Sequence, residues 1–113
     1  MSLEIKNAKI TKVSLGFEDH GILTCWITLD YGGCVQGFGG YGFSHRPKDK
    51  HIGAPDLADY ILGILTTLNV ATWEQLPGTI IRAEADHAGV HRIGHALKEQ
   101  WFNPQSVVGK RKP

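Results

Sequence analysis

Residues 22–42, ILTCWITLDYGGCVQGFGGYG, decide the fold, because they predict two antiparallel strands joined by a tight turn. The first predicted strand, residues 22–31, alternates between two faces. Gly32-Gly33 follows it, and a two-residue hairpin turn favours residues that accept a positive φ. One face of this strand carries Leu23, Cys25, Ile27, Leu29 and Tyr31.

The turn sets the register of the predicted hairpin. If Tyr31 pairs with Cys34, the next pairs are Leu29 with Gln36, Ile27 with Phe38, Trp26 with Gly39 and Cys25 with Gly40. The indole of Trp26 is then expected to cover Gly39, which has no side chain of its own. Cys25 and Cys34 lie far apart along this ladder, so no disulfide is predicted between them.

The second strand also contains Gly37-Phe38-Gly39-Gly40-Tyr41-Gly42, a literal G-x-G-x-x-G. A dinucleotide-binding motif needs a helix directly after the glycines, to receive the pyrophosphate. Here Phe43-Ser44-His45-Arg46-Pro47 follows instead, and the first predicted helix begins near residue 56. We therefore predict a strand whose glycines allow a close approach to the backbone. The approaching group is either the protein's own helix or a partner.

The flanking segments predict one main helix and a long N-terminal strand. Residues 3–15 alternate imperfectly and indicate one long or bent strand, or two short strands broken near Asn7. An apolar stripe predicts a helix over residues 56–68. Asp56 is expected to be its N-cap, and Asn69 tolerates the left-handed conformation that ends a helix.

The C-terminal third predicts two further strands. Thr72-Trp73-Glu74-Gln75 has capping-box spacing and predicts a single helical turn. Residues 79–85 alternate again, residues 86–89 predict a turn, and a returning strand begins at Val90. Trp101-Phe102 is expected to plug the core, and the chain from Asn103 is expected to be loop.

This order of elements predicts an α+β fold. We expect an antiparallel sheet of about five strands with one main helix packed on one face, in the order βββ, helix, short helix, ββ. The 113 residues are expected to form a single domain, 1–113, in which residues 106–113 are a mobile basic tail.

The composition is typical of a soluble globular protein, with 42% hydrophobic and 20% charged residues. The formal net charge of +1 gives no electrostatic reason to expect nucleic acid or an anionic membrane as a partner. No apolar run approaches the ~20 residues of a membrane-spanning helix, and residues 1–12 lack the apolar segment of a signal peptide. Two cysteines make no disulfide framework, so a reduced cytosolic setting is expected.

Three histidines, His87, His91 and His95, are spaced by four residues and would share one face of a helix, where imidazoles bind zinc. Gly89 and Gly94 interrupt such a helix. On a strand, His91 and His95 instead share a face with each other, and His87 lies in the turn. Hydrogen bonding within the structure and metal binding both stay open, and no metal ligand or cofactor is assigned.

Glu18-Asp19-His20 places two carboxylates and an imidazole in one turn, and these residue types serve acid–base catalysis and metal binding. Consecutive residues do not all converge on one point, so a polar contact loop is the favoured interpretation. No catalytic residue is assigned. The position of Cys25 on an apolar strand face predicts that its thiol is buried in the core and unreactive. Arg46 lies in a short basic loop, which is expected to be solvated or, alternatively, to offer charge to a phosphate.

Three stretches carry a resemblance: LGFEDHGILTCWITLDYGGCVQGFGGYGF (15–43), TWEQLPGTIIRAEAD (72–86) and VHRIGHALKEQWFNP (90–104). Together they span most of the chain, and they resemble a family of small proteins encoded by phages and prophages. The resemblance implies a phage accessory protein and supplies no catalytic residues. Such proteins often bind and block a host protein, including CRISPR effectors, or sequester a signalling nucleotide.

We therefore expect a non-enzymatic binding protein that inhibits a host defence or regulatory factor, such as a CRISPR complex, in the bacterial cytoplasm. The expected contact residues are Glu18, Asp19, His20, Gln36, Phe38, Tyr41, Arg46, His91 and His95. One alternative is a small-ligand or nucleotide sponge, in which the glycine backbone meets phosphates and Arg46, His91 or His95 adds charge. A second alternative is a metal-dependent hydrolase that uses Asp19, His20, His91 and His95.

Overall fold

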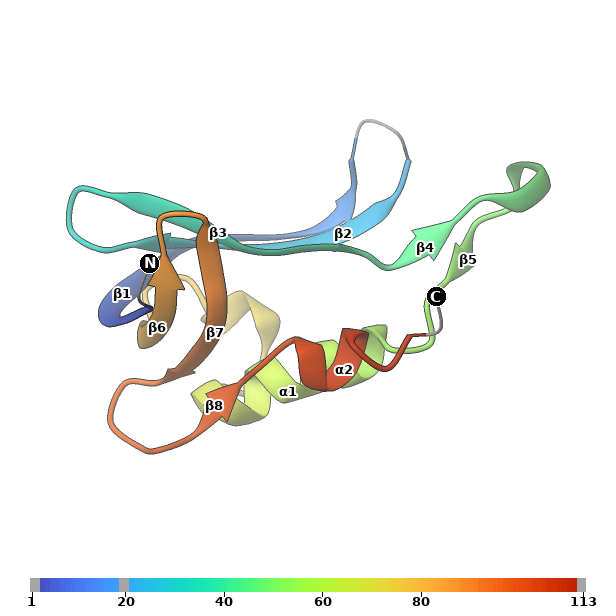
Figure 1. Ribbon diagram of the computed structural model, residues 1–113. Coiled ribbons are helices and arrows are strands. Elements are labelled where there is room, and N and C mark those ends of the chain that lie inside the picture. Colours follow the sequence, from blue (N-terminus) through green and yellow to red (C-terminus); the bar gives the residue numbers. More distant parts are fainter. Residues whose placement is uncertain (1–2, 19–20, 112–113) are drawn as a thin grey trace.

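The computed structural model describes residues 3–18 and 21–111, and it shows a six-stranded antiparallel sheet packed around one main helix (Figure 1). The strand order is β3-β2-β1-β6-β7-β8. These strands are β1 (Glu4–Phe17), β2 (Leu23–Asp30), β3 (Val35–Gly42), β6 (Ile80–Asp86), β7 (Gly89–His95) and β8 (Trp101–Phe102). The predicted α+β class is confirmed, but the sheet has six strands rather than about five.

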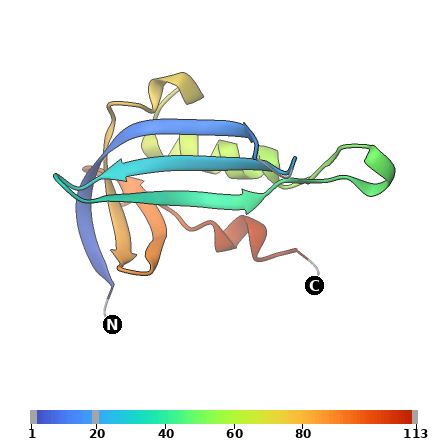
Figure 2. The same ribbon diagram turned by 90° about the horizontal axis from the view of Figure 1, so that it is seen from above.

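β1 is one continuous strand that joins the two halves of the sheet, and it is not broken near Asn7. Its first half, up to Lys9, pairs with β6, and its second half, from Lys9 to Phe17, pairs with β2. A bulge between Ile10 and Lys12 interrupts the second ladder. Because a bulge bends its strand, β1 can follow both halves of the curved sheet, as Figure 2 shows.

The β2–β3 hairpin has the predicted turn. Gly32 and Gly33 adopt φ values of 99° and 121°, and the Tyr31 amide donates to the Cys34 carbonyl at 2.8 Å. The Asp30 carboxylate accepts from both glycine amides, at 2.7 and 3.2 Å. The predicted pairs of Leu29 with Gln36, Ile27 with Phe38 and Trp26 with Gly39 are confirmed.

The predicted pairing of Cys25 with Gly40 is wrong. The ladder shifts between Thr24 and Trp26, because β3 contains one more residue than β2 at this point and Thr24 pairs with Gly42. Gly39 and Gly40 both have positive φ values, 110° and 82°. Glycine accepts such angles without steric cost, so the glycine-rich strand bulges here.

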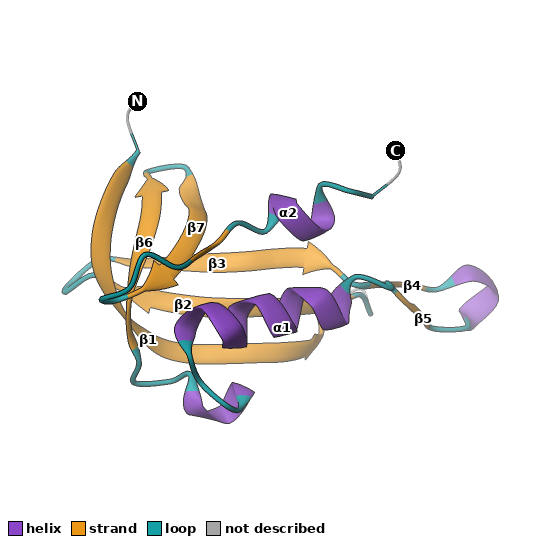
Figure 3. Ribbon diagram, turned by 90° about the horizontal axis from the view of Figure 1, so that it is seen from below, coloured by secondary structure: helices purple, strands orange, loops and turns teal. Residues whose placement is uncertain are grey.

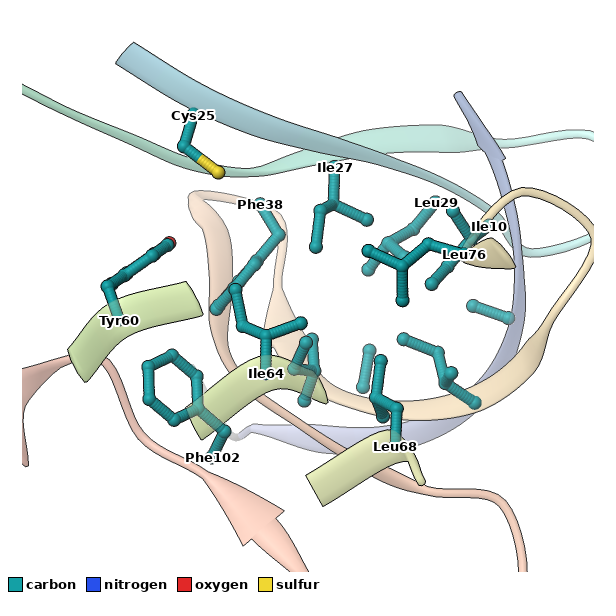
Figure 4. Packing of buried hydrophobic residues seen from close by; sticks show 14 of the residues in the cluster. Ile10, Cys25, Ile27, Leu29, Phe38, Tyr60, Ile64, Leu68, Leu76 and Phe102 are labelled. Carbon is teal, nitrogen blue, oxygen red and sulfur yellow. The ribbon is translucent and has the colours of Figure 1, made fainter. Parts of the chain in front are cut away.

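The main helix, α1 (Leu57–Leu68), lies across the concave face of the sheet (Figure 3). Its apolar stripe is the buried face, and Tyr60, Ile64 and Leu68 point toward side chains of β2 and β3 (Figure 4). The helix ends at Asn69 with φ 57°, as predicted. Asp56 occupies the N-cap position, but its side chain makes no capping hydrogen bond.

The chain after Asn103 is not a loop, as had been expected. It forms a short helix, α2 (Gln105–Val108), and Val108 is buried against the core. The Arg111 Nη2 then donates to the Asp56 Oδ1 at 2.8 Å, which attaches the end of the described chain to the start of α1. The expected tail from residue 106 thus contacts the core and the start of α1 as far as Arg111, and residues 112–113 lie outside the described part.

Two short elements lie outside the main sheet. β4 (Ser44–His45) and β5 (Ile52–Gly53) pair as a separate ribbon around the 3₁₀ turn η1 (Pro47–Asp49). A second 3₁₀ turn, η2 (Trp73–Gln75), stands where capping-box spacing predicted a helical turn. The Gln75 side chain accepts from the amides of Ala71 and Thr72, which closes that turn.

Among the described residues, no helix is long and apolar enough to cross a membrane.

Candidate binding surfaces

The glycines of β3 are covered by the protein's own side chains. The ring of Trp26 lies over Gly37 and Gly40. A Cβ at Gly40 would collide with the ring, and a Cβ at Gly37 would stand only 3.0 Å from it. On the opposite side, a Cβ at Gly39 would meet the Cys25 carbonyl and the Tyr60 hydroxyl. The approaching groups are therefore a neighbouring strand and α1, and the predicted strand with close backbone approach is confirmed. Trp26 covers Gly37 and Gly40 rather than Gly39, because the bulge turns Gly39 inward.

Trp26 is held on the outer face of the hairpin and keeps 37% of its surface exposed. Its Nε1 donates to Glu18 Oε1 at 3.1 Å. Ile22, with 41% of its surface exposed, lies against Gly42, and the Arg46 side chain lies against Gly21. We name this group, Glu18, Ile22, Trp26 and Arg46, the tip surface, because it surrounds the end of the β1–β2 hairpin.

A groove of about 440 Å³ lies at the other end of β1. Lys6 Nζ stands 5.2 Å from the centroid of the Tyr31 ring. The Tyr31 hydroxyl donates to Gln36 Oε1 at 2.7 Å, and Gln36 Nε2 donates to the Asp86 carbonyl at 2.8 Å. This chain of hydrogen bonds joins β3 to the β6–β7 turn. The groove is lined by Glu4, Lys6, Tyr31, Cys34, Gln36, Ala85, Asp86 and His87.

The pKa values of the two titratable groups at this junction shift in opposite directions, although desolvation acts to raise both. Desolvation is the larger cause that raises the pKa of Tyr31 above its usual value. Desolvation also opposes ionisation of Asp86, but the hydrogen bond from His91 and the Ala88 and Gly89 amides lower the pKa of Asp86 overall. The His91 Nε2 lies 3.3 Å from Asp86 Oδ2. Asp86 is therefore an ionised anchor for the turn.

The three histidines do not form a cluster. His91 lies beside a bulge in β7 and pairs with Asp86, and His87 lies exposed in the turn. His95 Nδ1 accepts from the amides of Leu97 and Lys98, at 3.0 and 3.1 Å. His95 thus orders the loop between β7 and β8.

The nine predicted contact residues fall into separate places. Glu18, bonded to Trp26, and Arg46, beside Gly21, belong to the tip surface, while Gln36 and His91 both contact Asp86 beside the groove. His95 accepts hydrogen bonds from the loop between β7 and β8. Asp19 and His20 lie outside the described residues.

The two aromatic residues of the predicted set point inward. Phe38 is buried with 1% of its surface exposed and packs against Phe102, so it is wrong as a surface anchor. Tyr41 is half-buried, and its ring meets Tyr60 edge-on at 5.9 Å. The bulge at Gly39 and Gly40 places both residues on the core face of β3, because alternation over the three positions from Phe38 to Tyr41 would put them on opposite faces.

The predicted residue set lacked Lys6, Tyr31 and Asp86, whose proximity depends on the curvature of the sheet. β3 and β7 lie side by side although they are separated by three strands in sheet order. Tyr31 and Asp86 each flank a predicted turn, and turn ends are where side chains from distant strands can meet. The sequence therefore indicates that Tyr31 and Asp86 stand beside turns, but it does not indicate that these two turns lie next to each other.

Within residues 3–18 and 21–111, no three His, Cys, Asp or Glu side chains are placed to hold a metal ion. The register of β1 separates the candidates further. Glu4 pairs with Ala85 near the groove, whereas Phe17 pairs with Leu23 at the tip. His91 and Glu18 therefore stand at opposite ends of a strand that runs from Glu4 to Phe17.

Comparisons with family models, with curated proteins and with solved structures find no match for this chain.

Proposed function

We propose that this is a phage accessory protein that acts by binding, as an inhibitor of a host defence or regulatory factor such as a CRISPR effector, in the bacterial cytoplasm. The resemblance of residues 15–43, 72–86 and 90–104 to small phage and prophage proteins supports the origin. The observation that carries the binding role is the exposed and preordered Trp26 of the tip surface.

Preordering lowers the cost of binding. An interface side chain that must be immobilised loses about 0.5–1.5 kcal/mol of conformational freedom. The side chain of Trp26 has already lost this conformational freedom in the unbound protein, because its ring lies on glycine backbone and its Nε1 donates a hydrogen bond to Glu18. Tryptophan and arginine are enriched among the residues that dominate interface energy, and Arg46 stands beside the same hairpin end. Ile22 adds exposed apolar area to the tip surface, where it lies against Gly42.

Affinity purification from a phage-sensitive host tests this proposal. The wild-type protein is expected to retain one host protein in a stoichiometric amount, and Trp26→Ala is expected to lose it. Leu62→Ala is the matched control, because Leu62 is an apolar side chain of α1 with 62% of its surface exposed. Retention of no host protein by the wild type, or equal retention by wild type and Trp26→Ala, would contradict the proposal.

A second candidate function is supported by the groove. In the lining of the groove, the Lys6 ammonium group lies beside the aromatic ring of Tyr31. Gln36 and His87 add polar groups to the same lining. A small ligand with a ring and an anionic group fits such a lining. This differs from a phosphate loop on the glycines, which Trp26 and Tyr60 cover.

A thermal-shift panel of nucleotides tests the second candidate, since a ligand that binds only the folded state raises Tm by mass action. A nucleotide that binds in the groove is expected to raise the Tm of the wild type and not that of Lys6→Ala. Lys98→Ala, on the loop after β7, is the control. Absence of a shift with every nucleotide would remove this candidate.

A further inference from the structure

The second half of β1 has an open edge. Ile10 is the last residue bonded on the β6 side, where its amide donates to Thr79 and its carbonyl accepts from Gly78. From Lys12 to Phe17, β1 pairs with β2 on one side only, and no other strand among the described residues occupies the opposite side. Such an edge presents a row of backbone donors and acceptors that can pair with another strand.

This edge has few of the features that prevent edge strands of natural proteins from pairing with other chains. Folded proteins usually guard edges with several charges, with proline or with short length. Residues 11–17, TKVSLGF, contain one lysine and no proline. Leu15 and Phe17 pair with Cys25 and Leu23 and so share the core face of the sheet. They keep 45% and 63% of their surfaces exposed, and the Phe17 ring contacts His51 at a centroid distance of 4.8 Å. The segment is therefore apolar on one face, open at its edge and almost uncharged.

The residues of this edge are self-complementary in an antiparallel register centred on Leu15. Leu15 then faces Leu15 of a second copy, and Val13 faces Phe17, so apolar residues meet on the α1 face. On the outer face Ser14 meets Gly16, and Lys12 meets Glu18. Directly opposite residues share a face of a sheet, so every pair in this register is matched in character, and the one lysine meets a carboxylate twice by symmetry.

We propose that two copies of this chain pair their β1 edges through residues 12–18, centred on Leu15, so that their sheets join into one continuous sheet. Main-chain hydrogen bonds supply the association, and the Lys12–Glu18 pairs set the register. A shift of the centre to Val13 or Ser14 would leave Lys12 opposite Ser14 or Gly16 and lose both ion pairs. The tip surface keeps Trp26 and Ile22 on the outer face in this dimer.

Sedimentation equilibrium of the purified full chain tests this pairing with charge exchanges. The wild type is expected to be a dimer at micromolar concentration. Lys12→Glu places two carboxylates opposite each other, and Glu18→Lys places two ammonium groups opposite each other. Each single variant is expected to raise the dimer dissociation constant by roughly tenfold, since close cross-strand charges act twice in the dimer.

The double variant Lys12→Glu/Glu18→Lys restores the opposite charges and is expected to return the dissociation constant to within about threefold of the wild type. Lys98→Glu, the same charge change away from β1, is the control and is expected to leave it unchanged. Circular dichroism and Tm confirm that each variant is folded. A monomeric wild type overturns the proposal. So does a double variant that dimerises no better than the single variants, or a pair of single variants that dimerise as the wild type does.

Discussion

The two cysteines differ in environment although they lie in the same hairpin. Cys25 is buried on the core face of β2, and desolvation raises the pKa of its thiol to about 12. Cys34 is exposed beside the turn. Because the thiolate is the reactive form, a thiol reagent at pH 8 is expected to label one cysteine per folded chain and two in denaturant. Cys34→Ser should abolish the labelling of the folded chain. Rapid labelling of Cys25 in folded Cys34→Ser would contradict this assignment.

Tyr60 is the central aromatic residue of the core, and its hydroxyl has no hydrogen-bond partner among the described residues. Burial raises the pKa of this phenol far above its usual value. Since a buried unpaired hydroxyl costs about 1–3 kcal/mol, we expect Tyr60→Phe to leave the free energy of unfolding unchanged or to raise it by about 1 kcal/mol. Denaturant unfolding measures this.

The ring of Tyr60 has a separate effect, because it meets Phe43 and Phe102 at centroid distances of 4.9 and 5.3 Å. Tyr60→Ala is therefore expected to lose about 3–5 kcal/mol, as other large aromatic truncations do. A loss above about 1 kcal/mol in Tyr60→Phe would show that the hydroxyl is satisfied in solution.

At the scale of elements, the glycine strand and Trp26 act as one unit. Gly40 has a φ of 82°, and a Cβ there would enter the indole of Trp26. Gly40→Ala is expected to cost about 1–3 kcal/mol of stability from the backbone angle alone, and to displace Trp26, which fluorescence reports as a shift of the emission maximum. Gly53→Ala is the control, since nothing lies within 4 Å of a Cβ at Gly53. Equal behaviour of the two variants would contradict the account of the strand.

Elements with a strong local pattern were predictable from the sequence. The β2–β3 hairpin, α1 and the β6–β7 pair were predicted because alternation, apolar stripes and turn residues repeat over enough positions to be recognised. β8 and α2 were missed, since elements of two and four residues are too short to show a period. The bulge near Gly39 was missed because the residue count of a ladder is set by packing against Trp26 and Tyr60.

The candidate site was less predictable than the fold, for a physical reason. The predicted register already indicates that Phe38 lies inward, because Phe38 pairs with Ile27 and directly opposite residues share a face of the sheet, so that error was avoidable. The groove depends on the proximity of β3 and β7, which results from sheet curvature and has no local signal. The role of His95 likewise depends on a loop whose shape the sequence does not indicate.

At the scale of the whole molecule, one ion pair joins the segment that follows α2 to the start of α1. Arg111 binds Asp56 through two nitrogens, and this hydrogen bonding, partly opposed by desolvation, lowers the pKa of Asp56. A carboxyl whose pKa is lower in the folded state stabilises the fold above its unfolded pKa of about 4 and loses this effect as the pH falls through the folded pKa.

The Tm difference between wild type and Asp56→Asn is therefore expected to be largest near pH 7 and to shrink as the pH falls below about 4. Thermal unfolding followed by circular dichroism measures it. Asp59→Asn, an exposed carboxylate of the same helix, is the control and should show a smaller difference. A wild-type advantage over Asp56→Asn that is constant from pH 7 to pH 3 would contradict the assigned role of the pair.

The central claim is that the tip surface binds a host protein through Trp26. Calorimetric titration of the captured host protein with the wild type, Trp26→Ala and Leu62→Ala tests this claim most directly. A tryptophan at the centre of an interface contributes about 2 kcal/mol or more, which corresponds to a roughly thirtyfold change in Kd. We predict that Trp26→Ala weakens binding by at least this factor while Leu62→Ala binds as the wild type does. Equal Kd values for Trp26→Ala and the wild type would contradict the claim.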